Sequence, residues 1–161
     1  MKRTPLLILL VVGLLSACVS IDCPIDNVVR TYYELKTPAA TADTLKDTLT
    51  IVSHRVDGTD TLLLNKGYAI SKFNLHVGHT NPEDTLYFRF SNGAYKATDT
   101  VWVRKENYPH FESVDCAGTF FHQITGISTT HHAIDSIVIN YTSVTYDTSP
   151  VHFYLYLKKR H

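Results

Sequence analysis

The stretch VHFYLYLK, residues 151–158, is the clearest fold signal in the chain. Its odd-numbered positions are apolar, and its even-numbered positions carry His, Tyr, Tyr and Lys. Because successive side chains of a β-strand point to opposite faces, this alternation predicts a strand with one face in a core and the other in solvent. His152 and Tyr154 are therefore both expected on the solvent face.

The same signal recurs along the rest of the chain. Apolar residues alternate with polar ones over 73–77, 86–90, 101–103 and 137–141, and β-branched or aromatic runs predict further strands over 28–35, 49–56, 61–64 and 119–125. Asp57-Gly58 and Asn92-Gly93 separate neighbouring runs, where a tight hairpin turn requires positive φ. The pattern predicts consecutive antiparallel strands joined by short turns.

Eight or nine strands and no helical pattern predict an all-β fold. We expect an antiparallel β-sandwich, Ig-like in its general architecture, with an open barrel as the alternative. The 161 residues suit one domain, which we place at 25–161. The 15 basic and 15 acidic residues balance, which argues against a protein built to bind nucleic acid.

The first 17 residues have the layout of a secretory signal peptide. Lys2 and Arg3 precede an apolar run over 6–15, and small residues follow. The run is too short for a transmembrane helix, which needs about 20 apolar residues. Leu15-Ser16-Ala17-Cys18 resembles the bacterial lipobox, which implies cleavage before Cys18 and acylation of Cys18, so that the membrane becomes a partner through the lipid. The alternative is an ordinary secreted protein.

The three cysteines, Cys18, Cys23 and Cys116, leave one unpaired in an exported protein, and acylation of Cys18 would account for it. Residues 18–24 then form a short lipidated tether, and Cys23 and Cys116 are free to form a disulfide in an oxidising compartment. Two buried, reduced thiols are an alternative to the disulfide. A metal site is the weaker alternative, because the two thiols are far apart in sequence and the chain has no Cys-x-x-Cys.

No pattern in the chain indicates catalysis. The nine histidines include no helical i, i+4 pair, and Gly126-Ile127-Ser128 lacks the second glycine of a nucleophile elbow. We therefore expect no metal, no cofactor and no enzymatic activity. The remaining candidate is a set of aromatic residues on predicted solvent faces, Trp102, Tyr154 and Tyr156, which can stack on sugars or on a partner protein. The alternative is that they pack under a loop.

The second half of the chain carries a family resemblance. It consists of Cys-Ala-Gly at 116–118, Phe-Phe at 120–121, Ile-Asp-Ser-Ile-Val-Ile at 134–139 and the closing Phe-Tyr-Leu at 153–155. Together these resemble a Bacteroidota lipoprotein family, the domain-of-unknown-function 6452 family. Ala117, which separates Cys from Gly, departs from the family pattern, as does the absence of Leu-Pro-Leu within 62–73. The resemblance implies an all-β envelope domain with a Cys23–Cys116 bridge, and no catalytic residues.

These observations predict an outer-membrane lipoprotein whose domain is a non-catalytic binding or accessory module, with an envelope protein or a glycan as partner. A purely structural envelope lipoprotein is the first alternative, and an uncharacterised enzyme is the second. Only Asp22 supplies negative charge just after Cys18, which favours the periplasmic side over the cell surface.

Overall fold

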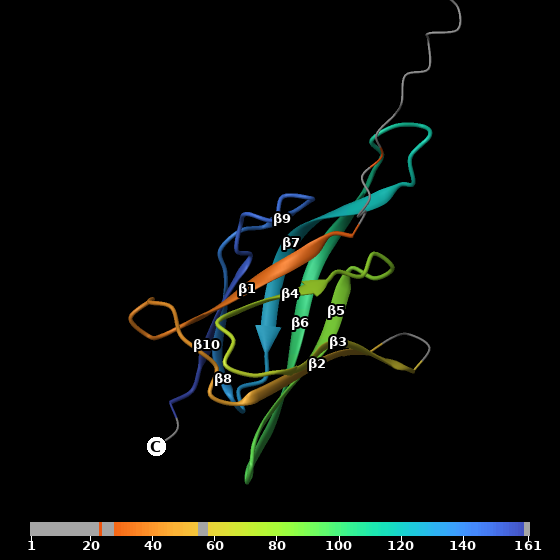
Figure 1. Ribbon diagram of the computed structural model, residues 1–161. Coiled ribbons are helices and arrows are strands. Elements are labelled where there is room, and N and C mark those ends of the chain that lie inside the picture. The colour runs from red at the N-terminus through yellow and green to blue at the C-terminus, as the bar shows by residue number, and fades with distance from the viewer. Residues whose placement is uncertain (1–22, 24–27, 55–57, 160–161) are drawn as a thin grey trace, which may run out of the picture.

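The protein is a sandwich of two β-sheets (Figure 1). The computed structural model describes residues 23, 28–54 and 58–159, and these residues contain ten strands and no helix. The predicted all-β sandwich is confirmed. The predicted signal peptide at 1–17, Cys18 and all of the tether except Cys23 lie outside the described residues.

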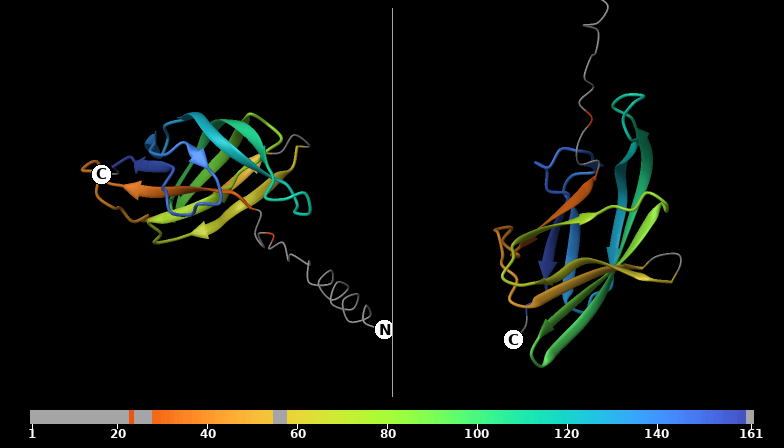
Figure 2. Two further views of the ribbon diagram at one scale, coloured as in Figure 1. Left: turned by 90° about the horizontal axis from the view of Figure 1, so that it is seen from above. Right: turned by 45° about the vertical axis from the view of Figure 1, so that its right-hand side comes forward.

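The strands divide into a sheet of four and a sheet of six, shown from two further sides in Figure 2. In spatial order, the four-stranded sheet consists of β4 (Lys72–His76), β1 (Arg30–Lys36), β10 (Phe153–Leu157) and β8 (Ile134–Ile139). The six-stranded sheet consists of β3 (Asp60–Gly67), β2 (Thr48–His54), β5 (Glu83–Asn92), β6 (Tyr95–His110), β7 (Thr119–Thr129) and β9 (Ser143–Val144). The described strands pair antiparallel, except that β1 and β10 are parallel.

The core between the sheets is built from the alternating residues that predicted the strands. Phe153 and Leu155 of β10 are fully buried, as the alternation requires. The ring of Tyr33 on β1 stacks between Phe73 and Phe153, with both centroid distances 4.8 Å. Such aromatic stacking adds to the burial of apolar area that holds the two sheets together.

The expectation that His152 faces solvent together with Tyr154 is wrong. It is fully buried just before β10 begins, because the segment that leads into β9 covers it. Its Nδ1 accepts a hydrogen bond from the Tyr32 backbone N–H at 3.0 Å, and its Nε2 lies 3.2 Å from the Ser143 carbonyl oxygen. Burial lowers the pKa of His152, so the neutral ring serves as a connector between β1 and β9.

One end of the sandwich is closed by Asp99 on β6. Its fully buried carboxylate accepts hydrogen bonds from the backbone N–H groups of residues 132, 133 and 134 at 2.7–2.8 Å, and one from the Thr130 hydroxyl at 2.9 Å. Burial alone disfavours the charge, but these hydrogen bonds outweigh it and lower the pKa of Asp99. They fix the connection that carries the chain from β7 in one sheet to β8 in the other.

β6 and β7 extend beyond the rest of the fold. The register between them shifts after Arg104, and from there residues 105–124 form a projecting hairpin that we call the arm (Figure 2). The opposite end of β6 forms the hairpin predicted at Asn92-Gly93, where Gly93 has a φ of 54°. The two hairpin tips therefore lie at opposite ends of one 16-residue strand.

Candidate binding site at the disulfide end

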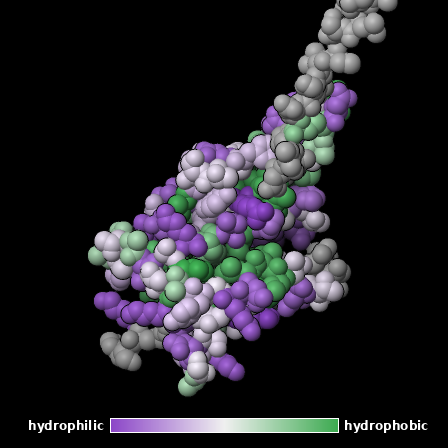
Figure 3. All heavy atoms as spheres, viewed as in Figure 1, coloured by the Kyte–Doolittle hydropathy of each residue, from purple (hydrophilic) through white to green (hydrophobic). Residues whose placement is uncertain are grey.

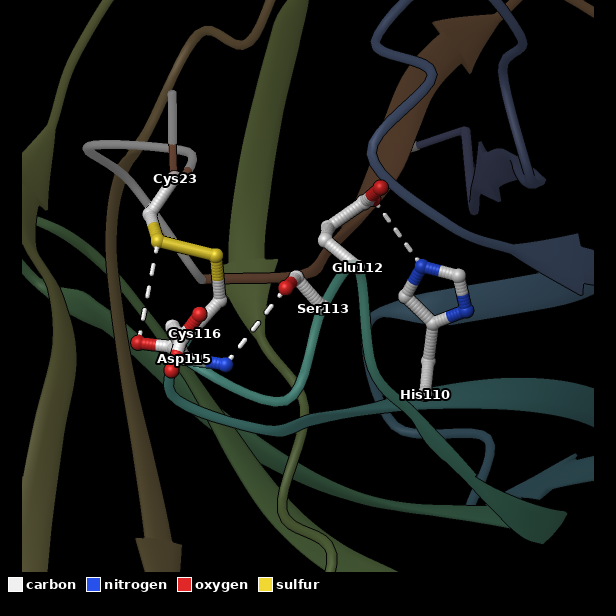
Figure 4. The surroundings of a disulfide bond; sticks show 6 residues. All are labelled: Cys23, His110, Glu112, Ser113, Asp115 and Cys116. Atoms are coloured by element: carbon white, nitrogen blue, oxygen red, sulfur yellow. Dashed lines mark hydrogen bonds and ion pairs between the residues drawn. A yellow bond between two sulfur atoms is a disulfide. The ribbon is translucent and has the colours of Figure 1, made fainter. Parts of the chain in front are cut away.

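A disulfide joins Cys23 to Cys116 in the tip of the arm, which we define as residues 111–118 (Figure 4). The two Cα atoms are 5.5 Å apart, across a sequence separation of 93 residues. The predicted pairing is confirmed, and the alternatives of free thiols and thiolate metal ligands are wrong. The bond attaches the segment that precedes β1 to the arm.

Local hydrogen bonds shape the turn that carries Cys116. The Cys116 N–H donates to the Ser113 carbonyl oxygen at 3.2 Å, and the Asp115 N–H lies 3.4 Å from the Ser113 hydroxyl. At the base of the tip, His110 Nε2 is 3.0 Å from a Glu112 carboxylate oxygen, as drawn in Figure 4. The tip is thus an ordered turn, in which Cys116 is held facing Cys23.

The arm is braced on both of its faces by neighbouring aromatic residues. Phe120 stacks on His79 of the β4–β5 loop, with centroids 4.7 Å apart and the rings nearly parallel. Phe121 stacks on His110 at 4.0 Å and meets the edge of Tyr146 at 5.0 Å. Since successive strand residues point to opposite faces, the contacts with His79 and Tyr146, which lie outside the arm, restrain it from both sides.

Two adjoining hollows open beside the arm and share Val77 and His79 in their walls. The larger, of about 430 Å³, lies between β3 and β4, the edge strands of the two sheets, and its walls include Thr61, Leu63, His76 and Leu86. The smaller, of about 330 Å³, is walled by Val28, Gly118, Thr119, Phe120 and His122. We call them together the cleft. Figure 3 shows an apolar region framed by hydrophilic side chains between β4 and the β2–β3 hairpin.

A buried ion pair fixes the loop that separates the two hollows. The side chain of Lys105 is 1% exposed, and its Nζ is 2.7 Å from Asp84 Oδ1 and 3.1 Å from the Asn81 carbonyl oxygen. The other oxygen of Asp84 accepts a hydrogen bond from the Gly78 N–H at 3.3 Å. Burial raises the pKa of Asp84, although Lys105 acts in the opposite direction. The pair ties residues 78–81 to the base of the arm.

A second set of hydrogen bonds continues from this loop to the floor of the smaller hollow. The Asn107 amide nitrogen donates to the carbonyl oxygens of His79 and Asn81, at 2.9 and 3.3 Å, which turns its Oδ1 toward His122 Nδ1 at 2.7 Å. That geometry assigns the ring proton to Nδ1 and leaves Nε2 as an acceptor. Burial lowers the pKa of His122 to about 4, so the ring is neutral near pH 7.

This network was not predicted from the sequence, although the sequence carries one signal for it. Lys105 follows Val101 and Val103 at the same two-residue spacing, and Asp99 precedes them, so alternation places both charges on the buried face of β6. A charged residue on a buried strand face implies a partner. Asp84, Asn107 and His122 give no comparable signal, because only the fold brings them to Lys105.

The three aromatic residues predicted as one binding surface lie on two different surfaces. Tyr154 and Tyr156 are partly exposed on the outer face of the four-stranded sheet, where Lys36 Nζ lies 4.8 Å from the Tyr154 ring centroid. Trp102 is partly exposed on the outer face of the six-stranded sheet, opposite Thr85 and Ser128. The structure does not bring Trp102 together with the two tyrosines, and a binding role for either surface stays a prediction.

The described residues offer no site for a metal ion: no group of three or more His, Cys, Asp or Glu side chains among them has suitable geometry. The histidines around the cleft have other contacts. His79 stacks on Phe120, and His54 Nδ1 lies 3.1 Å from Asp60, which also pairs with Arg89. Nor do the described residues include a helix that could span a membrane.

Comparison with known proteins gives one match. A family model, described as "Family of unknown function (DUF6452)", matches residues 48–157, which is more than half of the chain. The match covers β2 to β10 and therefore includes the arm, the ion pair and most of the cleft. Neither the curated proteins nor the solved structures yielded a match.

Proposed function

We propose that this chain, which belongs to the DUF6452 family, is a membrane-anchored lipoprotein of the cell envelope and that its β-sandwich is a non-catalytic binding module. The Cys23–Cys116 bond is the observation that carries the proposal. Five residues of extended chain span about 17 Å, so acylation of Cys18 would hold Cys23, and the arm bonded to it, close to the membrane. Outer-membrane attachment on the periplasmic side is part of this proposal.

The cleft is the surface that we assign to binding. It is concave and combines apolar walls with a few fixed polar groups, as small binding sites commonly do. Its loop is held in place by Lys105, Asp84 and Asn107, whose charges and hydrogen bonds are used within the network. This mutual satisfaction supports a positioning role for these residues rather than a catalytic one.

The edge strands on either side of the cleft favour an extended protein segment as the ligand. Within the described part of the chain, β3 pairs only with β2 and β4 pairs only with β1. Each edge thus presents backbone N–H and C=O groups that an added strand can use. We therefore propose a segment of an envelope protein as the partner, and a glycan as the alternative that the same experiment detects.

Photo-crosslinking in native envelope tests this proposal. A photoreactive residue replaces Leu63, in the wall of the cleft, and in a matched variant it replaces Val138, which is exposed beside Tyr154 on the outer face of the four-stranded sheet. We expect a discrete protein adduct from position 63 and none from position 138. An adduct from position 138 alone would move binding to the Tyr154 surface and refute the cleft.

The remaining outcomes separate the alternatives. An adduct from position 63 that carries carbohydrate and no second polypeptide would replace the protein partner with a glycan. No adduct from either position, in envelope where the protein is present at its normal level, would favour a purely structural lipoprotein and contradict the binding module.

A further inference from the structure

The tip of the arm exposes large apolar side chains where a soluble hairpin would usually carry polar ones. Val114 is 99% exposed and Phe111 is 67% exposed. The matching turn at the other end of β6 is Asn92-Gly93, with Ser91 and Lys96 beside it. Apolar side chains gathered at a projecting point indicate contact with another apolar phase or surface.

The phenyl ring of Phe111 is positioned by Gly118. A Cβ atom on residue 118 would lie 2.5 Å from the ring, so any other residue there would displace the ring from this position. The ring rests against the backbone of Gly118 and still exposes two thirds of its surface. The absence of a side chain at Gly118 thus gives the Phe111 ring a place on the outside of the tip.

The disulfide relates these side chains to the proposed anchor. Val114 lies two residues before Cys116, and Cys116 is bonded to Cys23, five residues after Cys18. The length of chain between the proposed acyl group and Cys23 spans about 17 Å, which is smaller than the thickness of a bilayer. The exposed end of the arm is therefore tied to the part of the molecule nearest the lipid.

We propose that the tip of the arm is a second membrane contact, with Phe111 and Val114 inserted into the interfacial layer of the bilayer that holds the acyl anchor. This inference rests on the proposed function, because it needs the anchor at Cys18. Apolar and aromatic side chains favour that layer, and two attachment points would hold the domain in one orientation. The cleft, which shares Gly118 and Phe120 with the arm, then opens close to the membrane surface.

The charges of the tip specify the kind of bilayer. Glu112 and Asp115 are acidic, and no lysine or arginine lies within 111–118. An acidic tip is repelled by anionic headgroups and is compatible with zwitterionic ones. Insertion is accordingly expected in zwitterionic vesicles, and it should be weaker when anionic lipid is added.

Depth-dependent fluorescence quenching tests the proposal on the full acylated chain. Trp102 is the single tryptophan, so a Trp102→Phe background is silent, and Val114→Trp adds a reporter at the tip. The matched control adds Asn92→Trp to the same background, at the opposite end of β6. The protein is reconstituted into phosphatidylcholine vesicles with brominated acyl chains, and the two variants are compared.

We expect the emission of the tryptophan at position 114 to shift to shorter wavelength and to be strongly quenched, while that at position 92 is unaffected. Unquenched emission from position 114 in protein that floats with the vesicles would overturn the membrane contact and leave the anchor standing. A chain that carries no acyl group and does not float would instead refute the proposed function. A blue shift seen only in native envelope, and not in vesicles, would assign the tip to a protein partner and overturn the proposal.

Discussion

Asp99 and Lys105 stand on the same buried face of β6, six residues apart, and the chain accommodates their charges in opposite ways. Asp99 is surrounded by three backbone N–H groups and a hydroxyl, and the exposed ring of His132 places its Nδ1 3.3 Å from Asp99 Oδ1. Lys105 is paired with Asp84, a partly buried carboxylate on the neighbouring strand. The pKa of Asp99 is lowered, whereas that of Asp84 is raised.

The difference matches what each end of the molecule does. The backbone N–H groups that bind Asp99 belong to the connection from β7 to β8. Their hydrogen bonds hold this connection across one end of the two sheets, which closes that end. The Lys105–Asp84 pair instead holds a loop beside the cleft and supports the projecting arm. A buried ion pair is a poor source of stability compared with apolar packing, so its presence beside a cleft favours a role in shaping that cleft.

Removing the Asp99 carboxylate should have the largest effect on stability. Asp99→Ala leaves three backbone N–H donors without this acceptor, two of them in buried residues, and each buried loss costs about 1–3 kcal/mol. We expect the free energy of unfolding in urea to fall by about 4 kcal/mol or more. Asp99→Asn, which keeps the size of the side chain and one acceptor oxygen, should lose less. A loss below about 1 kcal/mol for Asp99→Ala would show that Asp99 does not close this end.

Loss of the disulfide should cause the second-largest decrease in stability. Its effect should be on the end of the molecule that carries the arm and the cleft, opposite to Asp99. The bond closes a loop of 93 residues, and such bonds contribute about 2–4 kcal/mol. We expect the Cys23→Ser, Cys116→Ser double variant to unfold at lower urea concentration, with faster amide hydrogen exchange in the arm and unchanged exchange around Asp99. Equal acceleration at both ends would contradict the separation of the molecule into a sealed end and a cleft end.

Breaking the ion pair should cost somewhat less, and the cost should be reversible by a second change. Lys105→Met leaves Asp84 without its partner, for which we expect a loss of about 2–3 kcal/mol. The double variant with Asp84→Leu replaces both charges by apolar side chains and should recover to within about 1 kcal/mol of the parent protein. If the double variant is instead the less stable of the two, the pair is a net source of stability and the shaping role is wrong.

The smallest expected effect is a pH dependence from His122. Its pKa is lowered from 6.5 to about 4 in the folded protein, so below pH 6.5 the unfolded chain binds the additional proton. The contribution of the neutral ring is complete above pH 6.5 and is lost as the pH falls toward 4. In the His122→Gln variant, the free energy of unfolding should therefore fall less between pH 6.5 and pH 4 than it does in the parent protein. Urea unfolding at several pH values measures this difference. NMR should show the parent His122 ring still neutral at pH 5.5, and a protonated ring there would refute the assignment.

The sequence predicted those features that depend on local pattern. Alternation located five of the strands and β-branched or aromatic runs located four more, because each of these strands has enough residues to show a pattern. It did not locate β9, which has two residues, and it placed His152 in solvent because alternation carries no information about a segment that covers a strand from elsewhere in the chain. The parallel pairing of β1 with β10 joins the two ends of the domain, and local pattern does not encode which strands become neighbours.

The candidate site was predictable only where covalent chemistry restricts the choices. With Cys18 assigned to the lipid, Cys23 and Cys116 had one possible pairing, and the structure has it. The cleft is lined by residues from β2, β3, β4, β5 and β7, and their contacts arise from the register of long-range pairs. Asp99 and Lys105 were visible as charges on a buried face, but their partners were not.

We propose that the Cys18 end of the chain is acylated and that the disulfide holds the arm beside it. The intact mass of the protein extracted from native envelope, taken before and after reduction, tests both parts in one measurement. We predict a chain that begins at Cys18, carries diacylglycerol and an N-acyl group, and gains the mass of two hydrogen atoms on reduction. A chain without lipid, or one whose mass is unchanged by reduction because Cys23 and Cys116 are already thiols, would contradict the account.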